Sequence, residues 1–271
     1  MKLEIIKPIG LCNSAQKILN EVNKYLNKYM NIYILGEILH NEYVINELSN
    51  KGIKFVKDLK TIEKNKYTLV VLPSHGTSPL VYEKLSGYNY IDLTCPKIKK
   101  MQDFVLDNTD KDILFLGKKG HSESLAFVGY PNVTMIHSVS DVDNLKSDLK
   151  DPILMCQTTF TEQLFVEVAE KLEEKYPNIV IKNTLCNIPL ERIKNINSSK
   201  ADMLLVIGSK TSSNANELKN SKTNSKIVSY KTDINIEELL KYDTVAIASA
   251  SSTPIEQVNI IVDAIKNATS K

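Results

Sequence analysis

The sequence predicts an α/β protein built on mostly parallel sheets. Short apolar runs, as expected of buried strands, alternate with longer stretches whose apolar residues recur at helical spacing. Most of these runs end at polar or reactive residues such as Cys, His, Ser and Thr. In open sheets of βαβ units, ligands bind beyond the carboxyl ends of the strands. We therefore expect the strand ends to converge on one cleft, with ordinary polar loops as the alternative.

The expected elements follow each other along the whole chain. The predicted strands cover residues 32–35, 69–72, 113–116, 153–155, 204–207 and 245–247. The predicted helices cover residues 15–29, 42–50, 98–106, 161–176, 214–219, 236–241 and 254–266. Thr161 is suited to cap one helix, and Pro254 is suited to the first turn of another.

Length and charge exclude several classes of protein. A chain of 271 residues exceeds one average domain, so two or three small units are expected. The net charge is only +2, without a basic stripe interleaved with aromatic residues, which argues against a nucleic-acid partner. We see neither a secretory leader nor an apolar stretch long enough to span a bilayer. The expected location is therefore the cytoplasm, without membrane association.

Cysteine spacing suggests how the chain is divided. Cys12, Cys95 and Cys186 separate segments of similar length, each with room for a few strands and helices. We expect three similar αβ lobes in a pseudo-threefold arrangement around a common centre. Their bounds would be residues 13–95, 96–184 and 185–271, with residues 1–12 adding a strand to the third.

The same three cysteines are candidate metal ligands. They lie too far apart for a local zinc knuckle, and so long a chain does not need disulfide staples. Iron–sulfur clusters usually take four thiolates, so three dispersed cysteines would leave one iron without a protein ligand. An open iron can act as a Lewis acid on a hydroxyl while the cluster supplies electrons. For any one cysteine alone a buried inert thiol is the alternative, and we assign Cys156, inside an apolar run, to packing.

Histidines and hydroxyls after the strands indicate an anion site. Diphosphate binding needs several N–H, O–H or cationic donors around two phosphates, and helix starts help to supply them. The candidate residues follow predicted strands or precede predicted helices: His40, His75, His121, Ser212, Ser213, Asn214 and Ser252. The alternative for a serine-rich turn is a helix cap alone.

Glu123 is the candidate proton donor. Removing a hydroxyl as water requires an acid near the leaving oxygen, and Glu123 stands two residues beyond His121. Thr158 or Thr159 can orient the acid or the substrate hydroxyl. An exposed loop carboxylate is the alternative.

Taken together, these motifs resemble the 4-hydroxy-3-methylbut-2-enyl diphosphate reductase (IspH/LytB) family, in family order and over essentially the whole chain. The matching blocks are Gly10-Leu11-Cys12, residues 35–44, Ser74-His75-Gly76, Asp92-Leu93-Thr94-Cys95-Pro96, Gly120-His121-Ser122-Glu123, Gln157-Thr158-Thr159, Leu185-Cys186, residues 208–214 and residues 250–254.

The resemblance implies a fold, a cofactor and a reaction. It implies a 4Fe-4S cluster on Cys12, Cys95 and Cys186 with one open iron site, in a three-lobed fold. The seven histidine, serine and asparagine residues above would bind the diphosphate, Glu123 would deliver a proton, and Thr158 and His121 would assist. The implied reaction is reductive removal of the allylic hydroxyl, giving isopentenyl and dimethylallyl diphosphates in the methylerythritol phosphate pathway. Ferredoxin or flavodoxin would supply the electrons.

Several positions depart from the family pattern. Gln102 and Lys118 stand where histidines are common, and Leu125-Ala126 replaces an expected Glu-Gly. The segment 187–191 departs from the usual sequence after the third cysteine, although Arg192 is kept. Asn13-Ser14 and Lys17 depart from the usual sequence after the first. The alternatives are a paralogue with the same cluster and another substrate, a non-catalytic iron–sulfur sensor, and a metal-free α/β binding protein.

Overall fold

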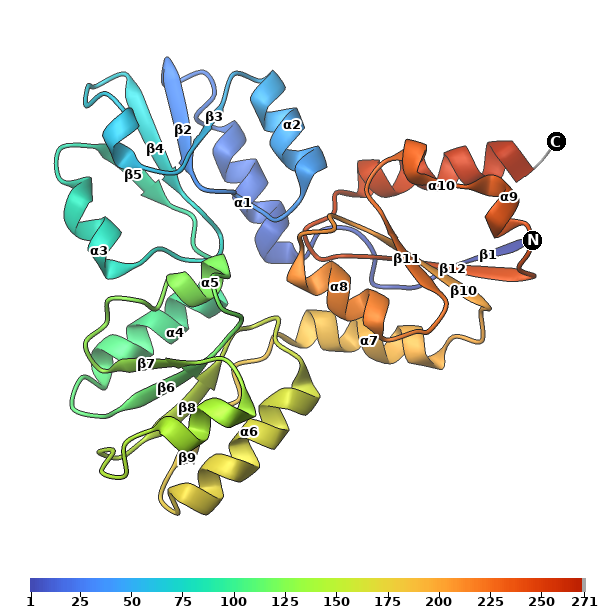
Figure 1. The fold of residues 1–271 in the computed structure, drawn as a ribbon. Coiled ribbons are helices and arrows are strands. Elements are labelled where there is room, and N and C mark those ends of the chain that lie inside the picture. Colours follow the sequence, from blue (N-terminus) through green and yellow to red (C-terminus); the bar gives the residue numbers. More distant parts are fainter. Residues whose placement is uncertain (270–271) are drawn as a thin grey trace. The chain divides into compact units, whose positions relative to one another are not determined.

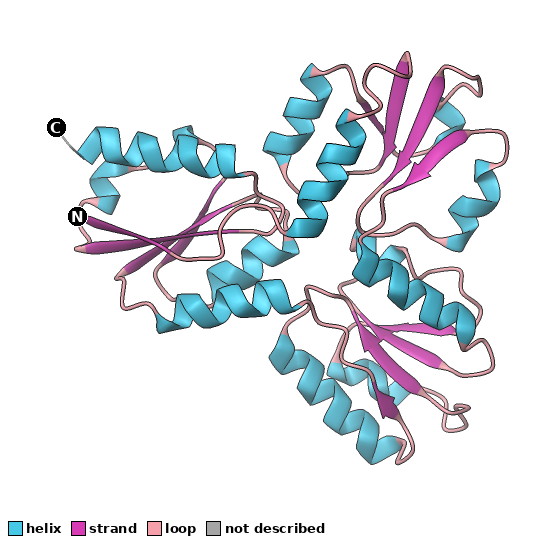
Figure 2. Cartoon of the chain, turned by 180° about the vertical axis from the view of Figure 1, so that it is seen from behind, coloured by secondary structure: helices cyan, strands magenta, loops and turns pink. Residues whose placement is uncertain are grey.

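The computed structural model describes residues 1–269 and contains three four-stranded sheets (Figure 1). Every strand pairing in these residues is parallel, which confirms the predicted α/β class. Helices flank the sheets (Figure 2). The chain forms two compact units: Met1–Lys24, Leu39–Ile53 and Cys186–Lys271 make the first unit, and Tyr25–Ile38 and Lys54–Leu185 make the second. The division into three lobes stays a prediction, and residues 270–271 of its last segment lie outside the described residues.

The first unit contains one sheet, in the order β1-β12-β10-β11. Its strands are β1 (Lys2–Ile5), β12 (Thr244–Ser249), β10 (Met203–Ile207) and β11 (Ser225–Val228). Its helices are α1 (Asn13–Asn23), α2 (Glu42–Asn50), α7 (Asn187–Ser198), α8 (Ser213–Asn220), α9 (Ile236–Leu239) and α10 (Ile255–Thr269), with a 3₁₀ turn at Lys231–Asp233.

Strand β10 shows why this sheet is covered on both faces. Helices α9 and α10 lie on one face of the sheet and α7 and α8 on the other (Figure 1). Met203 and Leu205 are buried in the core cluster with α9 and α10, whereas Leu204 and Val206 are buried in the cluster with α7 and α8. Successive side chains of a strand point to opposite faces, so a strand buried on both sides is apolar throughout. Because the four strands are parallel, their carboxyl ends reach the same edge of the sheet.

The second unit contains the other two sheets, ordered β3-β2-β4-β5 and β7-β6-β8-β9. The first of these consists of β3 (Lys54–Val56), β2 (Asn31–Leu35), β4 (Thr68–Leu72) and β5 (Asn89–Asp92). The second consists of β7 (Val133–Ile136), β6 (Ile113–Leu116), β8 (Ile153–Cys156) and β9 (Val180–Ile181). The helices are α3 (Pro79–Tyr82), α4 (Pro96–Asp107), α5 (Ser122–Leu125) and α6 (Glu162–Lys175), with 3₁₀ turns at Leu59–Thr61, Glu83–Leu85 and Val139–Asn144.

Helix α4 is held to the sheet by apolar packing in this unit. Ile98, Met101 and Val105 of α4 are buried in one cluster with Phe115 of β6 and with Phe127. The rings of Phe115 and Phe127 stack with their centroids 4.2 Å apart. The start of α4, immediately after Cys95, is therefore fixed relative to the end of β6.

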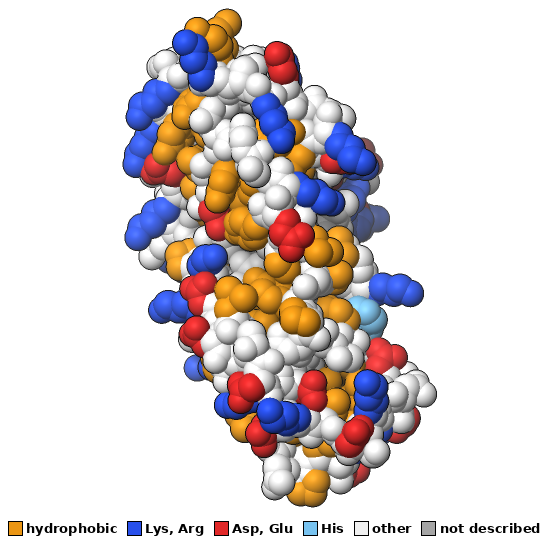
Figure 3. All heavy atoms as spheres, turned by 90° about the vertical axis from the view of Figure 1, so that its left-hand side faces the viewer, with side chains coloured by type: hydrophobic (Ala, Val, Ile, Leu, Met, Phe, Trp, Pro, Cys, Tyr) orange, Lys and Arg blue, Asp and Glu red, His pale blue; other side chains and the backbone are white. Residues whose placement is uncertain are grey.

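The surface carries charges of both signs. On the face drawn in Figure 3, lysines, carboxylates and apolar side chains are interspersed, and neither sign forms a block among the described residues. This mixture agrees with the net charge of +2. No helix within residues 1–269 is long and apolar enough to cross a membrane.

Candidate functional site

Asn214 presents an amide donor at the carboxyl edge of the first unit's sheet. Its Oδ1 accepts hydrogen bonds from the backbone N (2.8 Å) and the Oγ (2.6 Å) of Ser251. Its Nδ2 is buried and has no hydrogen-bond partner among the described residues. Leaving a buried donor unpaired costs roughly 1–3 kcal/mol. The Asn214 amide is thus available to donate to an acceptor, and its role in the predicted anion site stays a prediction.

Ser212 and Ser213 lie at the start of α8, beside Asn214. The Ser212 Oγ accepts from the backbone N of Ala215 at 3.2 Å, so Ser212 is the N-cap of this helix. Ser212 therefore acts as a helix cap, which was the alternative to anion binding for a serine-rich turn. A further contact of Ser212 with an anion stays a prediction. The helix start adds partial positive charge near the Asn214 amide.

A buried hydrogen-bond chain connects the segment of His40 to the loop after β10. The Asn41 Nδ2 donates to the Gln257 Oε1 (3.0 Å), and the Gln257 Nε2 donates to the Ser229 backbone O (2.8 Å). The Ser229 Oγ in turn donates to the Gly208 O (2.8 Å). We call Asn41, Gln257 and Ser229 the amide chain; their side chains are almost completely buried. Beside it, the Ser252 Oγ donates to the His40 O at 3.2 Å, which brings two predicted anion ligands together.

The acid candidate Glu123 is paired with Thr158 in the second unit. The backbone N of Thr158 donates to one carboxylate oxygen of Glu123 (2.6 Å), and the Thr158 Oγ1 donates to the other (2.8 Å). Glu123 is only 3% exposed, which rules out the alternative of an exposed loop carboxylate. His121 is the N-cap of α5, and its Nδ1 accepts from the Glu123 backbone N at 3.2 Å. The structure thus brings the three predicted catalytic residues together.

Gln157 supports this acid pair and was not predicted as a site residue. Its Oε1 accepts from the Lys118 backbone N (3.0 Å) and lies 3.5 Å from the Ser124 Oγ. Its Nε2 donates to the Thr159 Oγ1 at 3.1 Å. Gln157 therefore connects the loop after β6, helix α5 and the end of β8. Its position beside Thr158 and its complete burial are the signals that mark it.

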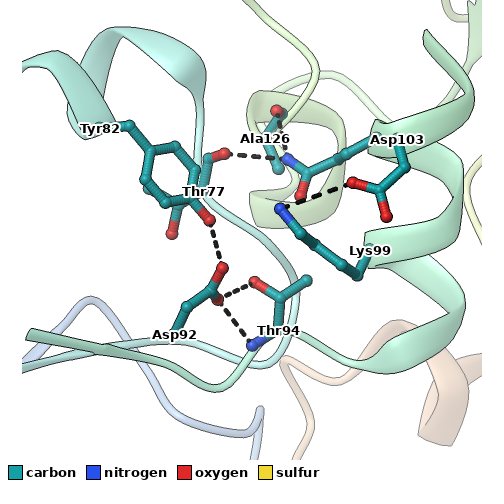
Figure 4. A network of polar contacts seen from close by, with 8 residues as sticks. Thr77, Tyr82, Asp92, Thr94, Lys99, Asp103 and Ala126 are labelled. Atoms are coloured by element: carbon teal, nitrogen blue, oxygen red, sulfur yellow. Dashed lines mark hydrogen bonds and ion pairs between the residues drawn. The ribbon is translucent and has the colours of Figure 1, made fainter. Parts of the chain in front are cut away.

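The turn that carries Cys95 is organised by Asp92 (Figure 4). One carboxylate oxygen of Asp92 accepts from the Thr94 backbone N (3.0 Å) and Oγ1 (2.5 Å), and the other accepts from the Tyr82 hydroxyl (2.6 Å). Burial alone would raise the pKa of Asp92, but the hydrogen bonds from Thr94 and Tyr82 outweigh it and hold that pKa below its usual value. Asp92 is therefore ionised at neutral pH and fixes Thr94, the residue immediately before Cys95.

Gln102 joins the His75 loop to the residue that caps the end of helix α5. Its Nε2 donates to the Thr77 O (2.9 Å) and to the Ala126 O (3.2 Å). Gly76 in the same loop has a φ of +87°, and an added Cβ would lie 3.0 Å from Ile98 and 3.1 Å from Ala126. The departures Gln102 and Ala126 thus pack against this loop.

Substituting Gly76 by alanine should destabilise the protein. The left-handed backbone is strained for alanine, and the methyl group would overpack the contact with Ile98, so we expect a loss of roughly 2–4 kcal/mol in the free energy of unfolding. Gly52→Ala is the matched control, because its φ is +85° and no atom lies within 4 Å of an added Cβ. Chemical denaturation of both variants measures the difference. An equal loss in both would show that the packing around Gly76 does not matter.

Three cysteines share properties that the fourth lacks. Cys12, Cys95 and Cys186 are half-buried and form no disulfide, and each is the N-cap of a helix: α1, α4 and α7. Iron–sulfur clusters are held by cysteine thiolates. Cys156 instead lies fully buried in β8, and burial raises its pKa to about 11, so it stays a protonated thiol. The prediction that Cys156 serves packing is confirmed. The assignment of the other three as cluster ligands stays a prediction.

The predicted site residues are distributed over both units. The first unit contains Cys12, Cys186, His40, Ser212, Ser213, Asn214 and Ser252. The second contains Cys95, His75, His121, Glu123 and Thr158. Within either unit, the part of the chain that the structure describes has no group of three His, Cys, Asp or Glu side chains able to hold a metal ion.

Comparison with known proteins identifies the family. The LytB protein family model matches residues 3–266. The chain belongs to the LytB (IspH) family. It is 30% identical to the 4-hydroxy-3-methylbut-2-enyl diphosphate reductase of Caldanaerobacter subterraneus, over 98% of this chain and 97% of that protein. It is 29% identical to the corresponding enzyme of Kosmotoga olearia, over 98% and 95% of the two chains.

Solved structures show the same LytB fold. The E-1-hydroxy-2-methyl-but-2-enyl-4-diphosphate reductase from Plasmodium falciparum superimposes with a TM-score of 0.90 at 26% identity, covering 97% of this chain and 87% of that one. A second structure, of (E)-4-hydroxy-3-methyl-but-2-enyl diphosphate reductase, gives a TM-score of 0.73 at 23% identity, covering 98% and 100%. The sequence-based assignment to this family is confirmed.

Proposed function

We propose that this LytB-family protein is an iron–sulfur reductase that removes the allylic hydroxyl of 4-hydroxy-3-methylbut-2-enyl diphosphate. The observation that carries the proposal is the buried Glu123, whose two carboxylate oxygens are both held by Thr158. A protein that only binds a cluster has no need of a buried acid. Relatives that match almost the full length of this chain are named as that reductase, which supports the same substrate.

Cys12, Cys95 and Cys186 would hold the cluster, as their half-burial and helix-capping positions support. When bound, a 4Fe-4S cluster with one open iron supplies electrons and a Lewis-acidic position for the hydroxyl oxygen. Ferredoxin or flavodoxin is the proposed electron donor. The cytoplasmic location expected from the sequence stays a prediction.

The remaining residues bind the substrate and move protons. The Asn214 amide, with Ser212, Ser213, Ser252 and the predicted histidines, would bind the diphosphate. Glu123 would give a proton to the leaving hydroxyl, while Thr158 fixes the direction of the carboxyl group. Loss of the hydroxyl as water consumes two electrons and two protons, of which one leaves with the oxygen and the other goes to carbon. The products are isopentenyl and dimethylallyl diphosphates.

An anaerobic assay tests the proposal. Cluster-loaded protein with a strong reductant and 4-hydroxy-3-methylbut-2-enyl diphosphate should form both products. Failure of fully loaded protein to form either would reject this substrate. The rebuilt contacts of Gln102 and Ala126 around the His75 loop favour a second candidate, a reductase of another allylic substrate. That enzyme would bind the cluster normally and fail this assay.

Exchanging Asn214 for aspartate should weaken diphosphate binding. One oxygen of the new carboxylate can still accept from Ser251, but its other oxygen replaces the amide donor and repels the anion. A hydrogen bond to a charged group contributes roughly 1.5–3 kcal/mol, so we expect a loss in affinity of roughly 10- to 100-fold. Titration of cluster-loaded protein with pyrophosphate measures it. Asn220→Asp, which adds the same charge at the exposed end of α8, is the control and should change affinity little.

A further inference from the structure

Arg192 is a buried cation on the helix that Cys186 caps, and it contacts the segment just before Cys12. It is the only arginine of the chain and lies on α7, six residues after Cys186. Its side chain is 1% exposed, and it shares the buried face of α7 with Pro189 and Ile196. A helix normally places an apolar residue at such a position. A guanidinium there therefore needs an explanation.

The guanidinium fixes the backbone just before Cys12. Its Nη2 donates to the Gly10 O at 2.7 Å, and its Nη1 donates to the Ser249 O and, at 3.1 Å, to the Ser249 Oγ. The Ser249 Oγ also accepts from the Gly10 N at 2.8 Å. Both polar groups of Gly10 are thus held, one by Arg192 and one by Ser249. The position of Cys12, two residues later, depends on this contact.

These hydrogen-bond partners are neutral, so they do not balance the charge of Arg192. Within residues 1–269 no carboxylate lies within 4.0 Å of its guanidinium nitrogens, and its Nε has no hydrogen-bond partner. Burial lowers the pKa of Arg192, and the negative groups that oppose this are Cys12, Glu191 and Cys186. Glu191 is exposed to solvent, which screens its charge. A buried charge without a counter-ion is strongly unfavourable. The backbone segment that Arg192 holds leads directly to Cys12, which makes the centre held by Cys12 and Cys186 the candidate anionic partner.

We propose that Arg192 is a positioning residue that acts as the counter-ion of the anionic centre held by Cys12 and Cys186. The proposal rests on the proposed function only in requiring that these cysteines bind an iron–sulfur cluster, and not in the identity of the substrate. Net charge and hydrogen bonding around a cluster set its reduction potential. A fixed buried cation stabilises the more negative, reduced state. Arg192 therefore makes the cluster easier to reduce, in addition to fixing Gly10.

The reduction potential of the cluster, measured in loaded protein without substrate, tests the proposal. Arg192→Gln, which removes the charge, should disfavour reduction by at least tenfold, a shift of about 59 mV to more negative potential for one electron. Arg192→Lys, which keeps the charge, should recover most of this shift. Glu191→Gln changes charge by one unit at an exposed neighbouring position and should move the reduction equilibrium less than threefold. An unchanged potential in Arg192→Gln would overturn the proposal.

A second variant separates charge from geometry and does not depend on the folding of Arg192→Gln. Ser249→Ala removes a hydrogen-bond acceptor of both Gly10 and Arg192 but leaves the guanidinium in place. Its reduction equilibrium should stay within threefold of that of the wild type. A tenfold shift in Ser249→Ala would show that backbone position, and not the charge, sets the potential. If the wild type forms no cluster, both the proposed function and this proposal fail; if the potentials shift but no product forms, only the proposed substrate is rejected.

Discussion

Exchanging Glu123 for glutamine is expected to abolish most of the turnover while leaving the cluster intact. Glutamine has almost the same shape and can keep the hydrogen bond from the Thr158 backbone N, but its amide is not an acid. Positioned acid catalysis contributes roughly 10²- to 10⁴-fold, so kcat should fall by that factor. Single-turnover and steady-state rates, together with iron and sulfide content, measure the two effects separately.

The control for Glu123→Gln is Glu170→Gln, an identical change at an exposed position of α6. It should retain full activity. Undiminished turnover in Glu123→Gln would remove Glu123 as the proton donor and would point to an acid elsewhere. The alternative of a non-catalytic sensor predicts a different result. Neither the wild type nor Glu123→Gln would then turn over, and the two proteins would have the same spectrum.

Replacing Cys95 by serine should eliminate the cluster and with it all detectable turnover. A serine hydroxyl is a poor substitute for a thiolate ligand, and only two of the three proposed ligands would remain. Anaerobically prepared Cys95→Ser should therefore have little iron or sulfide and no cluster absorption. Its circular dichroism should remain that of a folded α/β protein, because Cys95 lies at a helix end and is only partly buried at the edge of a core cluster.

Cys156→Ser is the matched control for this loss. It makes the same atom replacement in a buried thiol that already accepts a hydrogen bond from the Thr184 Oγ1 at 3.4 Å. We expect it to keep the cluster with a modest loss of stability. If Cys156→Ser lost the cluster and Cys95→Ser kept it, the ligand assignment would be wrong.

The central strands were predictable from the sequence because they are buried on both faces. Every residue of β4, β6, β8 and β10 is buried, so each strand contains an apolar run of at least four residues. The edge strands β3 and β5 were missed because partly exposed strands lack such a run. Helix α1 was predicted to continue to residue 29 but ends at Asn23, since the spacing of Tyr25 and Tyr29 imitates a helix across a separate turn.

Candidates for the reactive residues could be chosen from the sequence, whereas the residues that support them could not. Cysteine, histidine and acid candidates follow strands, and their chemistry alone makes them visible. Arg192, Gln157 and Gln257 act by contacts between segments far apart in the sequence, such as the bond between Arg192 and Gly10. Helix α7 was missed for a related reason, because the buried Arg192 interrupts its apolar stripe.

The amide chain sets a rule for engineering this scaffold. Asn41 donates to Gln257, and Gln257 donates to the Ser229 backbone. Replacing Asn41 or Gln257 alone therefore leaves a buried polar group of the remaining residue without its partner. A library that varies Asn41 alone, in order to admit a larger headgroup near His40, would return mainly misfolded clones. Co-randomising positions 41 and 257 lets a new polar pair be selected that keeps the bonds to the Val44 N and the Ser229 O. Altered selectivity should therefore emerge only from paired libraries.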